Sequence, residues 1–235
     1  MMAIFVGTAE EARLAAEVLG LTRRSVDGPL TCHSGVPAGW ACEVRVYSEV
    51  RGAELAWAAA RLACRRGAER IVCLGGAEAL PEVGPAGAIF EVASVRDGRG
   101  LDTVIRRTAD LSLELMGDAG DLPDEILLPE REGGPWPRKA LATTGLPLTV
   151  LTLGRKLWSE SGVALFDRRA LGSVEGARED GVDVRVIRWV ERTVGPLVAT
   201  GSGSAGKPLR DRALKRILRT LLASPVRSSC RLAAH

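Results

Sequence analysis

The strongest structural signal in this sequence is the stretch Arg70-Ile-Val-Cys-Leu-Gly-Gly-Ala-Glu-Ala-Leu80. Four apolar residues run directly into a pair of glycines, which is typical of a buried parallel strand that ends in a turn. In open α/β sheets, ligands bind beyond the carboxyl ends of such strands. Gly75 and Gly76 carry no Cβ, so a ligand can approach the backbone closely at this point. The stretch therefore predicts a small-molecule site, although a plain turn would explain the two glycines equally well.

Helices and strands alternate on both sides of this stretch. Residues 3–7 read as a short buried strand, and Thr8 and Glu11 have the spacing of a capping box that begins a helix over residues 10–19. A helix over residues 52–66 is apolar nearly all round, so we expect it to be covered on more than one side. Further strands are expected at residues 42–47, 88–95, 146–153, 163–166 and 182–190, and further helices at 169–179 and 209–222. The alternation predicts a three-layer α/β fold, with a central mixed, mostly parallel sheet flanked by helices.

Residues 96–137 interrupt this regular pattern. The segment is rich in glycine, proline and acidic residues, a composition that favours a surface insertion or flap over a linker between domains. We therefore expect residues 1–235 to form a single domain that carries this segment as an irregular insertion.

The composition is that of a soluble globular protein, with 46% hydrophobic and 26% charged residues. The 32 basic residues are nearly balanced by 29 acidic ones, and a net charge of +3 does not indicate a nucleic-acid partner. No apolar run approaches the length of a membrane span and no signal peptide is evident, so a cytoplasmic location is expected. The five cysteines are odd in number and show no CxxC spacing, which favours free buried thiols.

Histidine is scarce, since only His33 and His235 are present. A His-ligated zinc site is therefore not expected, and neither is any other metal or cofactor. The cluster Cys32-His33-Ser34 is not part of a nucleophile elbow, so we set it aside. Acid–base chemistry in this protein must depend mainly on carboxylates.

One glutamate and a set of four arginines are candidates for a site. Glu11 lies at a strand–helix junction, where its carboxylate could position a water molecule, although its capping role alone would account for it. Four arginines lie near strand ends in the last third of the chain, namely Arg168, Arg169, Arg188 and Arg192. They could bind phosphate or another oxyanion, or they could form a solvated basic rim.

Four segments have the order and spacing of motifs in a known superfamily: Ile4-Phe-Val-Gly-Thr-Ala-Glu-Glu11, Gly75-Gly-Ala-Glu-Ala-Leu80, Leu165-Phe-Asp-Arg-Arg-Ala170 and Val184-Arg-Val-Ile-Arg-Trp-Val-Glu-Arg192. They resemble the nucleoside phosphorylases and nucleosidases, particularly the methylthioadenosine/adenosylhomocysteine nucleosidases. The resemblance covers most of the chain apart from its irregular middle and its C-terminus. It implies a phosphorylase-like fold, a purine nucleoside-type ligand, and cleavage of an N-glycosidic bond by water or by phosphate.

The resemblance also implies site residues. Glu11 matches the family's water-positioning acid. Gly75, Gly76, Asp167 and Arg188 match positions expected to surround the ligand, although the family has a serine at the position of Gly76.

Two departures change the chemistry that the resemblance implies. Arg169 stands where the family has the glutamate that holds both ribose hydroxyls, and Arg192 stands where it has the aspartate that protonates the leaving purine. Both arginines are expected to contact the ligand, but arginine cannot act as an acid near neutral pH. Glu191, one residue before Arg192, is therefore the remaining candidate for the catalytic acid.

These departures leave two functions open. The chain is either a divergent enzyme, a nucleosidase or a nucleoside phosphorylase, or a catalytically inactive homologue that binds a nucleoside or an anion such as phosphate. Members of the superfamily commonly form homo-oligomers, and Trp57 and Trp158 are candidates for an interface.

Overall fold

The computed structural model describes residues 1–28, 30–48, 50–98, 125–130, 135–144, 159, 161–194 and 206–223. Within these residues, one sheet contains the strands β1 (Met2–Phe5), β2 (Arg23–Asp27), β3 (Leu30–Gly35), β4 (Val44–Tyr47), β5 (Arg70–Ala79), β6 (Ile89–Asp97), β7 (Glu125–Leu127), β8 (Arg138–Thr143), β9 (Val163–Asp167) and β10 (Asp183–Thr193). The helices are α1 (Ala9–Leu19), α2 (Ala53–Arg65), α6 (Ala170–Arg178) and α7 (Lys207–Ala223).

The centre of the sheet is parallel. Strands β4, β1, β5 and β10 lie side by side and run in the same direction. Beyond β4, the antiparallel strands β3 and β2 extend the sheet. On the other side, the path from β10 through β6, β8 and β9 returns to β5, so these five strands close into a ring. The mixed sheet expected from the sequence is confirmed: the central strands are parallel, and β8 also pairs in parallel with β6 and with β9.

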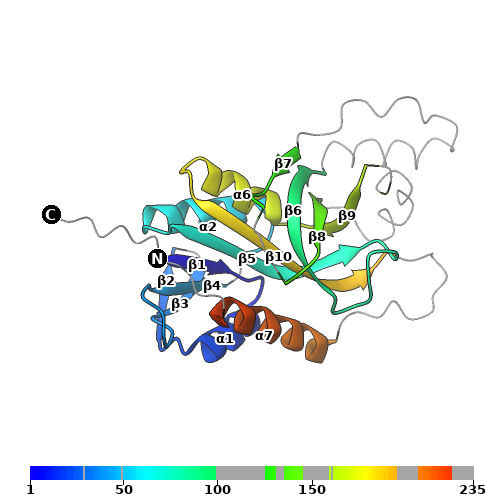
Figure 1. Cartoon of the computed structure of the whole chain (residues 1–235). Helices are drawn as coiled ribbons and strands as arrows, with labels where there is room; N and C mark the ends of the chain where they lie inside the picture. Colours follow the sequence, from blue (N-terminus) through cyan, green and yellow to red (C-terminus); the bar gives the residue numbers. More distant parts are fainter. Residues whose placement is uncertain are drawn as a thin grey trace, which may run out of the picture.

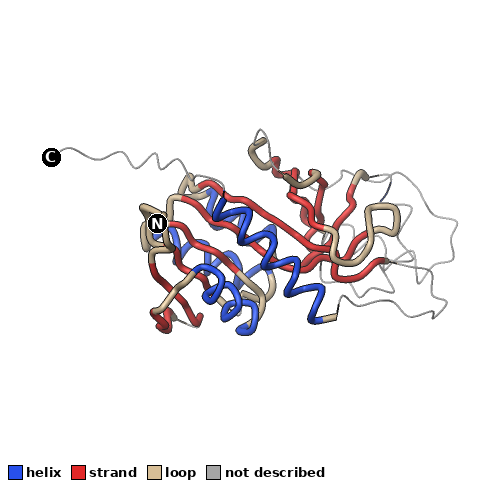
Figure 2. Tube along the Cα trace, turned by 60° about the horizontal axis from the view of Figure 1, so that its bottom comes forward, coloured by secondary structure: helices blue, strands red, loops and turns tan. Residues whose placement is uncertain are grey.

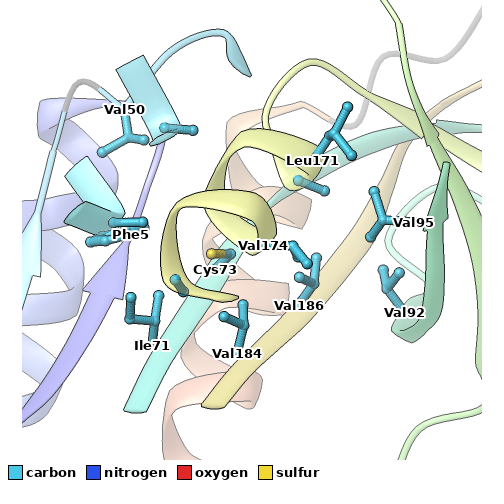
Figure 3. Close-up of a cluster of buried hydrophobic side chains, with 14 of the residues drawn as sticks. Phe5, Val50, Ile71, Cys73, Val92, Val95, Leu171, Val174, Val184 and Val186 are labelled. Carbon is cyan, nitrogen blue, oxygen red and sulfur yellow. The ribbon is translucent and has the colours of Figure 1, made fainter. Parts of the chain in front are cut away.

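Helices cover both faces of the central strands (Figures 1 and 2). α2 and α6 pack together on one face, and α1 and α7 pack together on the other. The residues of β5 alternate between the two resulting cores: Ile71 and Cys73 face α2 and α6, whereas Val72 and Leu74 face α1 and α7. Figure 3 shows Ile71 and Cys73 in the first core, together with Val174 of α6. The three-layer architecture is confirmed.

The capping box at the start of α1 is also confirmed. The hydroxyl of Thr8 accepts a hydrogen bond from the N–H of Glu11 (3.2 Å), and the carboxylate of Glu11 accepts one from the N–H of Thr8 (3.1 Å). At the other end, Gly20 takes the left-handed conformation (φ 68°) that closes many helices. Because the box ties α1 directly to the end of β1, the side chain of Glu11 is held at the carboxyl edge of the sheet.

α6 packs closely against α2 through its glycines. A Cβ at Gly172 would overlap the carbonyl oxygen of Ala53, and a Cβ at Gly176 would lie 2.6 Å from that of Trp57. The buried face of α2 consists of alanines: Ala56, Ala59, Ala60 and Ala63. The opposite face is open, since Trp57 is 40% exposed. α2 is therefore covered both by α6 and by the core that contains Phe5 and Ile71 of the sheet, as expected, while the face that carries Trp57 stays open.

This close contact makes Gly172 sensitive to substitution. We expect Gly172→Ala to destabilise the protein by about 1–3 kcal/mol, because the added methyl group meets backbone that cannot move aside as a flexible side chain could. Urea denaturation followed by circular dichroism measures the change. Glu175→Ala, on the exposed face of the same helix, is the matched control and should change the stability little. Equal midpoints for the two variants would contradict the close packing.

Some expected boundaries are corrected by the structure. Gly75 and Gly76 do not form a turn, because β10 pairs with β5 along its whole length and keeps the strand extended to Ala79. No apolar alternation marks β2, whose side chains are exposed from Arg23 to Val26, so its hairpin with β3 is not apparent in the sequence. β8 is likewise an unexpected strand.

Part of the expected organisation falls outside the described residues. The strand predicted at residues 146–153 lies entirely outside them. Residues 99–124 and 131–134 of the expected insertion also lie outside them. The described residues of that segment include the end of β6 and the short strand β7, which pairs with β6. No helix in the described part of the chain is long and apolar enough to cross a membrane.

Candidate functional site

A cavity of about 450 Å³ lies at the carboxyl ends of the central strands. Its lining residues are Gly7, Thr8 and Glu11 at the start of α1, Val50, Arg51 and Gly52 before α2, Gly76, Ala77 and Glu78 on β5, Thr144 after β8, Phe166, Asp167, Arg168 and Arg169 between β9 and α6, Glu191 and Arg192 on β10, and Arg210 on α7. Small-molecule sites typically measure about 300–1,000 Å³. The tip of the first helix and the ends of the central strands thus meet around one cavity of suitable size.

Glu11 is fixed in the wall of this cavity. The residue is 6% exposed, and its Oε2 accepts hydrogen bonds from the N–H groups of Gly7 (2.8 Å) and Thr8 (3.1 Å). Its Oε1 accepts no hydrogen bond from the part of the chain that the structure describes. One carboxylate oxygen therefore orients the side chain, and the other is left to interact with a molecule in the cavity.

Arg169 lies beside Glu11 and is held by main-chain oxygens. Its guanidinium donates to the carbonyls of Val50 (3.3 Å) and Leu74 (3.1 Å). A Cβ at Gly75 would overlap this guanidinium, so Gly75 makes room for Arg169 and does not itself line the cavity.

The charge of Arg169 is only partly balanced by its surroundings. Burial and the nearby Arg188 lower the pKa of its guanidinium, whereas Asp167 and Glu11 act to raise it. Arginine keeps its proton under all ordinary conditions. A cation therefore faces the cavity next to the carboxylate of Glu11.

Asp167 and Arg188 form a buried ion pair beneath the cavity. Oδ2 of Asp167 accepts hydrogen bonds from Nε (2.8 Å) and Nη2 (2.5 Å) of Arg188, and both side chains are almost fully buried. The remaining terminal nitrogen of Arg188 donates to the carbonyls of Cys73 (2.8 Å) and Ile187 (3.0 Å). Arg188 does not line the cavity, so the structure does not bring it into contact with a ligand there.

The other oxygen of Asp167 organises the start of α6. Its Oδ1 accepts hydrogen bonds from the hydroxyl of Thr143 (3.1 Å) and from the N–H groups of Arg169 (3.1 Å) and Ala170 (3.0 Å). Asp167 lines the cavity, but both of its oxygens are engaged by protein donors. A sugar hydroxyl could bind this carboxylate only by displacing one of them, so holding Arg188 and α6 in place is the role that its contacts support.

The Asp167–Arg188 pair makes the stability depend on pH in the acid range. Burial raises the pKa of Asp167, but Arg188, Arg169 and the Ala170 N–H outweigh it and hold the pKa below its ordinary value. A depressed folded-state pKa gives stability that is present above the unfolded value, about 3.9, and is lost as the pH falls through the folded-state value. We expect the difference in unfolding free energy between wild type and Asp167→Asn to be constant from neutral pH to about pH 5 and to shrink below about pH 4. Urea titrations at several pH values measure it, and a difference that grows on acidification would contradict the assignment.

Glu191 lies over Gly76. A Cβ at Gly76 would overlap Oε2 of Glu191 and would lie 3.0 Å from its Cβ and Cδ. The pairing of β10 with β5 shifts register between Val190 and Arg192, which leaves Glu191 in a bulge. Bulges re-aim side chains and are common beside active sites. The absence of a side chain at Gly76 thus gives the carboxylate of Glu191 its place in the cavity wall.

Several cavity residues are not predicted from the sequence. Glu78 is one of them, although its position two residues after Gly76 on the same strand is a signal that could identify it. Arg51 and Arg210 come from segments far apart in the sequence, so no local pattern points to them. Arg168 and Arg192, which are candidates from the sequence, line the cavity, where both act electrostatically on Glu78.

The remaining candidate cluster lies away from the cavity. Cys32 and His33 belong to β3, and burial raises the pKa of the Cys32 thiol to about 11. A thiol with that pKa is not a nucleophile near neutral pH. Among the described residues, no group of three or more His, Cys, Asp or Glu side chains could hold a metal ion.

Sequence comparison finds no relative of this chain, since no protein-family model and no curated protein matches it. Solved structures do match its fold. The methylthioadenosine/S-adenosylhomocysteine nucleosidase of Campylobacter jejuni aligns over 94% of this chain and 96% of its own, with a TM-score of 0.72 and 13% identity. The futalosine hydrolase of Helicobacter pylori aligns over 94% and 95%, with a TM-score of 0.71 and 12% identity. The chain has the nucleoside phosphorylase and nucleosidase fold.

A third nucleosidase-fold structure comes from Streptococcus pneumoniae. Its methylthioadenosine/S-adenosylhomocysteine nucleosidase, solved in complex with 8-aminoadenine, has a TM-score of 0.67 and 16% identity over 94% of this chain and 97% of its own. At identities of 12–16% the likeness is one of fold. The phosphorylase-like architecture expected from the sequence is confirmed.

Proposed function

We propose that this protein binds a purine nucleoside-type ligand in the cavity and hydrolyses its N-glycosidic bond. Cleavage of such a bond passes through a sugar with oxocarbenium character, so it needs a positioned water and a proton donor at the leaving base. Glu11 is the residue that we assign to the water. Glu191 is the carboxyl group that we assign to the leaving base.

The observation that carries this proposal is the placement of Glu11 and Glu191 in one cavity. The carboxylate of Glu11 has one oxygen fixed by the start of α1 and the other without a protein donor among the described residues. Glu191 reaches the same cavity from β10, over the gap that Gly76 leaves. Two carboxyl groups from different elements of one cavity are the arrangement that general acid–base cleavage requires.

Arg169 gives the sugar end of this cavity an unusual donor. A guanidinium can donate hydrogen bonds to sugar oxygens but cannot accept them. It also disfavours positive charge on the sugar, and it thereby favours substrates that present acceptor or anionic groups at that position.

The proposed activity is tested by following base release from a panel of nucleosides. Purified protein is incubated with methylthioadenosine, adenosylhomocysteine, futalosine and unmodified purine nucleosides, each with and without phosphate, and the free base is measured by liquid chromatography. Release that does not depend on phosphate is the expected result. The absence of release from every compound would count against the enzyme.

The arginines favour a second function, binding of an anionic nucleoside derivative without turnover. Arg168 and Arg192 line the cavity and have no carboxylate partner within ion-pair distance in the described part of the chain. This function predicts that a nucleotide or inorganic phosphate raises the melting temperature while no base is released. If base is released only when phosphate is present, phosphorolysis replaces hydrolysis.

A further inference from the structure

Glu78 is a cavity residue that the proposed reaction does not yet use. It lies on β5, two residues beyond Gly76, and residues two apart on a strand point to the same face. Val72 and Leu74 identify this face as the one covered by α1 and α7. The side chain of Glu78 therefore leaves the sheet on the same side as the space over Gly76, where the carboxylate of Glu191 lies.

The neighbouring strand brings Glu191 to the same wall. β10 runs parallel to β5, and Arg192 is the direct register partner of Glu78. The bulge between Val190 and Arg192 takes Glu191 out of the regular ladder. Glu78 and Glu191 consequently form a pair of carboxyl groups on adjacent strands, in one wall of the cavity.

We propose that Glu78, which lies beside Glu191 in this wall of the cavity, is the general acid that delivers a proton to the leaving base. The inference rests on the proposed cleavage of an N-glycosidic bond. It makes Glu78 the proton donor to the leaving base and leaves Glu191 as the neighbouring carboxyl group.

The charges around Glu78 support the retention of a proton. Burial raises the pKa of Glu78, Arg192 on β10 and Arg168 before α6 act to lower it, and Glu191 adds to the rise, so that the net direction is upward. A carboxyl group whose pKa is raised keeps its proton to a higher pH than an exposed glutamate does, which is what a general acid requires.

With Glu78 as the acid, every proton transferred in the reaction has a donor and an acceptor. The carboxyl O–H of Glu78 gives its proton to a ring nitrogen of the base while the C–N bond breaks, and the electron pair of that bond stays with the base. A water held by Glu11 forms the new C–O bond and transfers its proton to Glu11. Solvent carries the proton from Glu11 back to Glu78, so nucleoside and water yield the free base and the free sugar.

The test compares two leaving groups in wild type and in Glu78→Gln. With a purine nucleoside, which needs a proton on the base, kcat is expected to fall by about 10²–10⁴ and to lose its decline at high pH. With para-nitrophenyl ribofuranoside, whose phenolate leaves without a proton, kcat is expected to stay near that of wild type. Glu78→Asp should recover part of the activity on the nucleoside, and Glu175→Gln, on the exposed face of α6, is the matched control. Equal losses on both leaving groups, or an unchanged pH profile, would overturn the inference.

A titration without turnover separates this inference from the proposed function. Carbon NMR of glutamate carboxyl groups, with Glu78→Gln used to identify the signal of Glu78, reports its protonation directly. A Glu78 signal that titrates above those of exposed glutamates, and moves down in Glu191→Gln, supports the inference even if no nucleoside is cleaved. A signal that titrates with the exposed glutamates overturns it, whatever the outcome of the activity assay.

Discussion

Glu11→Gln is expected to slow base release by a factor of about 10²–10⁴, because the amide cannot take a proton from the attacking water. The amide oxygen of glutamine can still accept hydrogen bonds from the N–H groups of Gly7 and Thr8, so the start of α1 should remain intact. The melting temperature is therefore expected to change little while kcat collapses. Steady-state assays at saturating nucleoside and a thermal melt of the same preparation measure both effects.

The adjacent carboxylate supplies the control for this experiment. Glu10 is exposed, pairs with Arg210 (3.2 Å) and Lys207 (3.6 Å), and does not line the cavity. Glu10→Gln should therefore keep kcat close to the wild-type value. A Glu11→Gln protein that releases base at the wild-type rate would remove Glu11 from the mechanism.

Asp167→Asn is expected to lower the free energy of unfolding by about 3–5 kcal/mol, because it leaves the charge of Arg188 buried without its partner. The cost is large since Arg188 is enclosed by the sheet and cannot reach solvent. Urea denaturation at neutral pH measures the change, and a shift of the transition midpoint without a change in slope indicates lost stability alone.

Two further variants make the second prediction specific. Glu69 is an exposed carboxylate that approaches the N-terminal amine at 3.9 Å, and Glu69→Gln should leave the stability nearly unchanged. The double variant Asp167→Asn/Arg188→Met removes the stranded charge together with its partner, so it should be more stable than Asp167→Asn alone. A double variant that is less stable by the sum of the single effects would show that the two side chains act independently.

The sequence predicts the elements that have a strong local pattern. The capping box of Thr8 and Glu11 and the apolar run of β5 depend on neighbouring residues, so they can be recognised without a structure. β2 could not be recognised in this way, because its exposed residues carry no apolar alternation and its pairing with β3 alone defines it.

The candidate site was less accessible to prediction, because its geometry arises between elements. Glu11 and Glu191 can be proposed from spacing, but the bulge that re-aims Glu191 depends on how β10 pairs with β5. The engagement of Asp167 by Arg188 joins residues on different strands. Gly75 suggests space for a ligand in the sequence, whereas the fold fills that space with the guanidinium of Arg169.

The guanidinium of Arg169 bears on which inhibitors would suit this cavity. Compounds that imitate an oxocarbenium ion through a protonated nitrogen in the sugar ring gain affinity from nearby anions, and here such a nitrogen would meet the positive charge held by the carbonyls of Val50 and Leu74. Analogues with an uncharged ring, or with a carboxylate or sulfonate at that position, would instead be attracted. Under the proposed function, the positive charge of Arg169 thus predicts an inhibitor preference opposite to that of a site with a glutamate at this position.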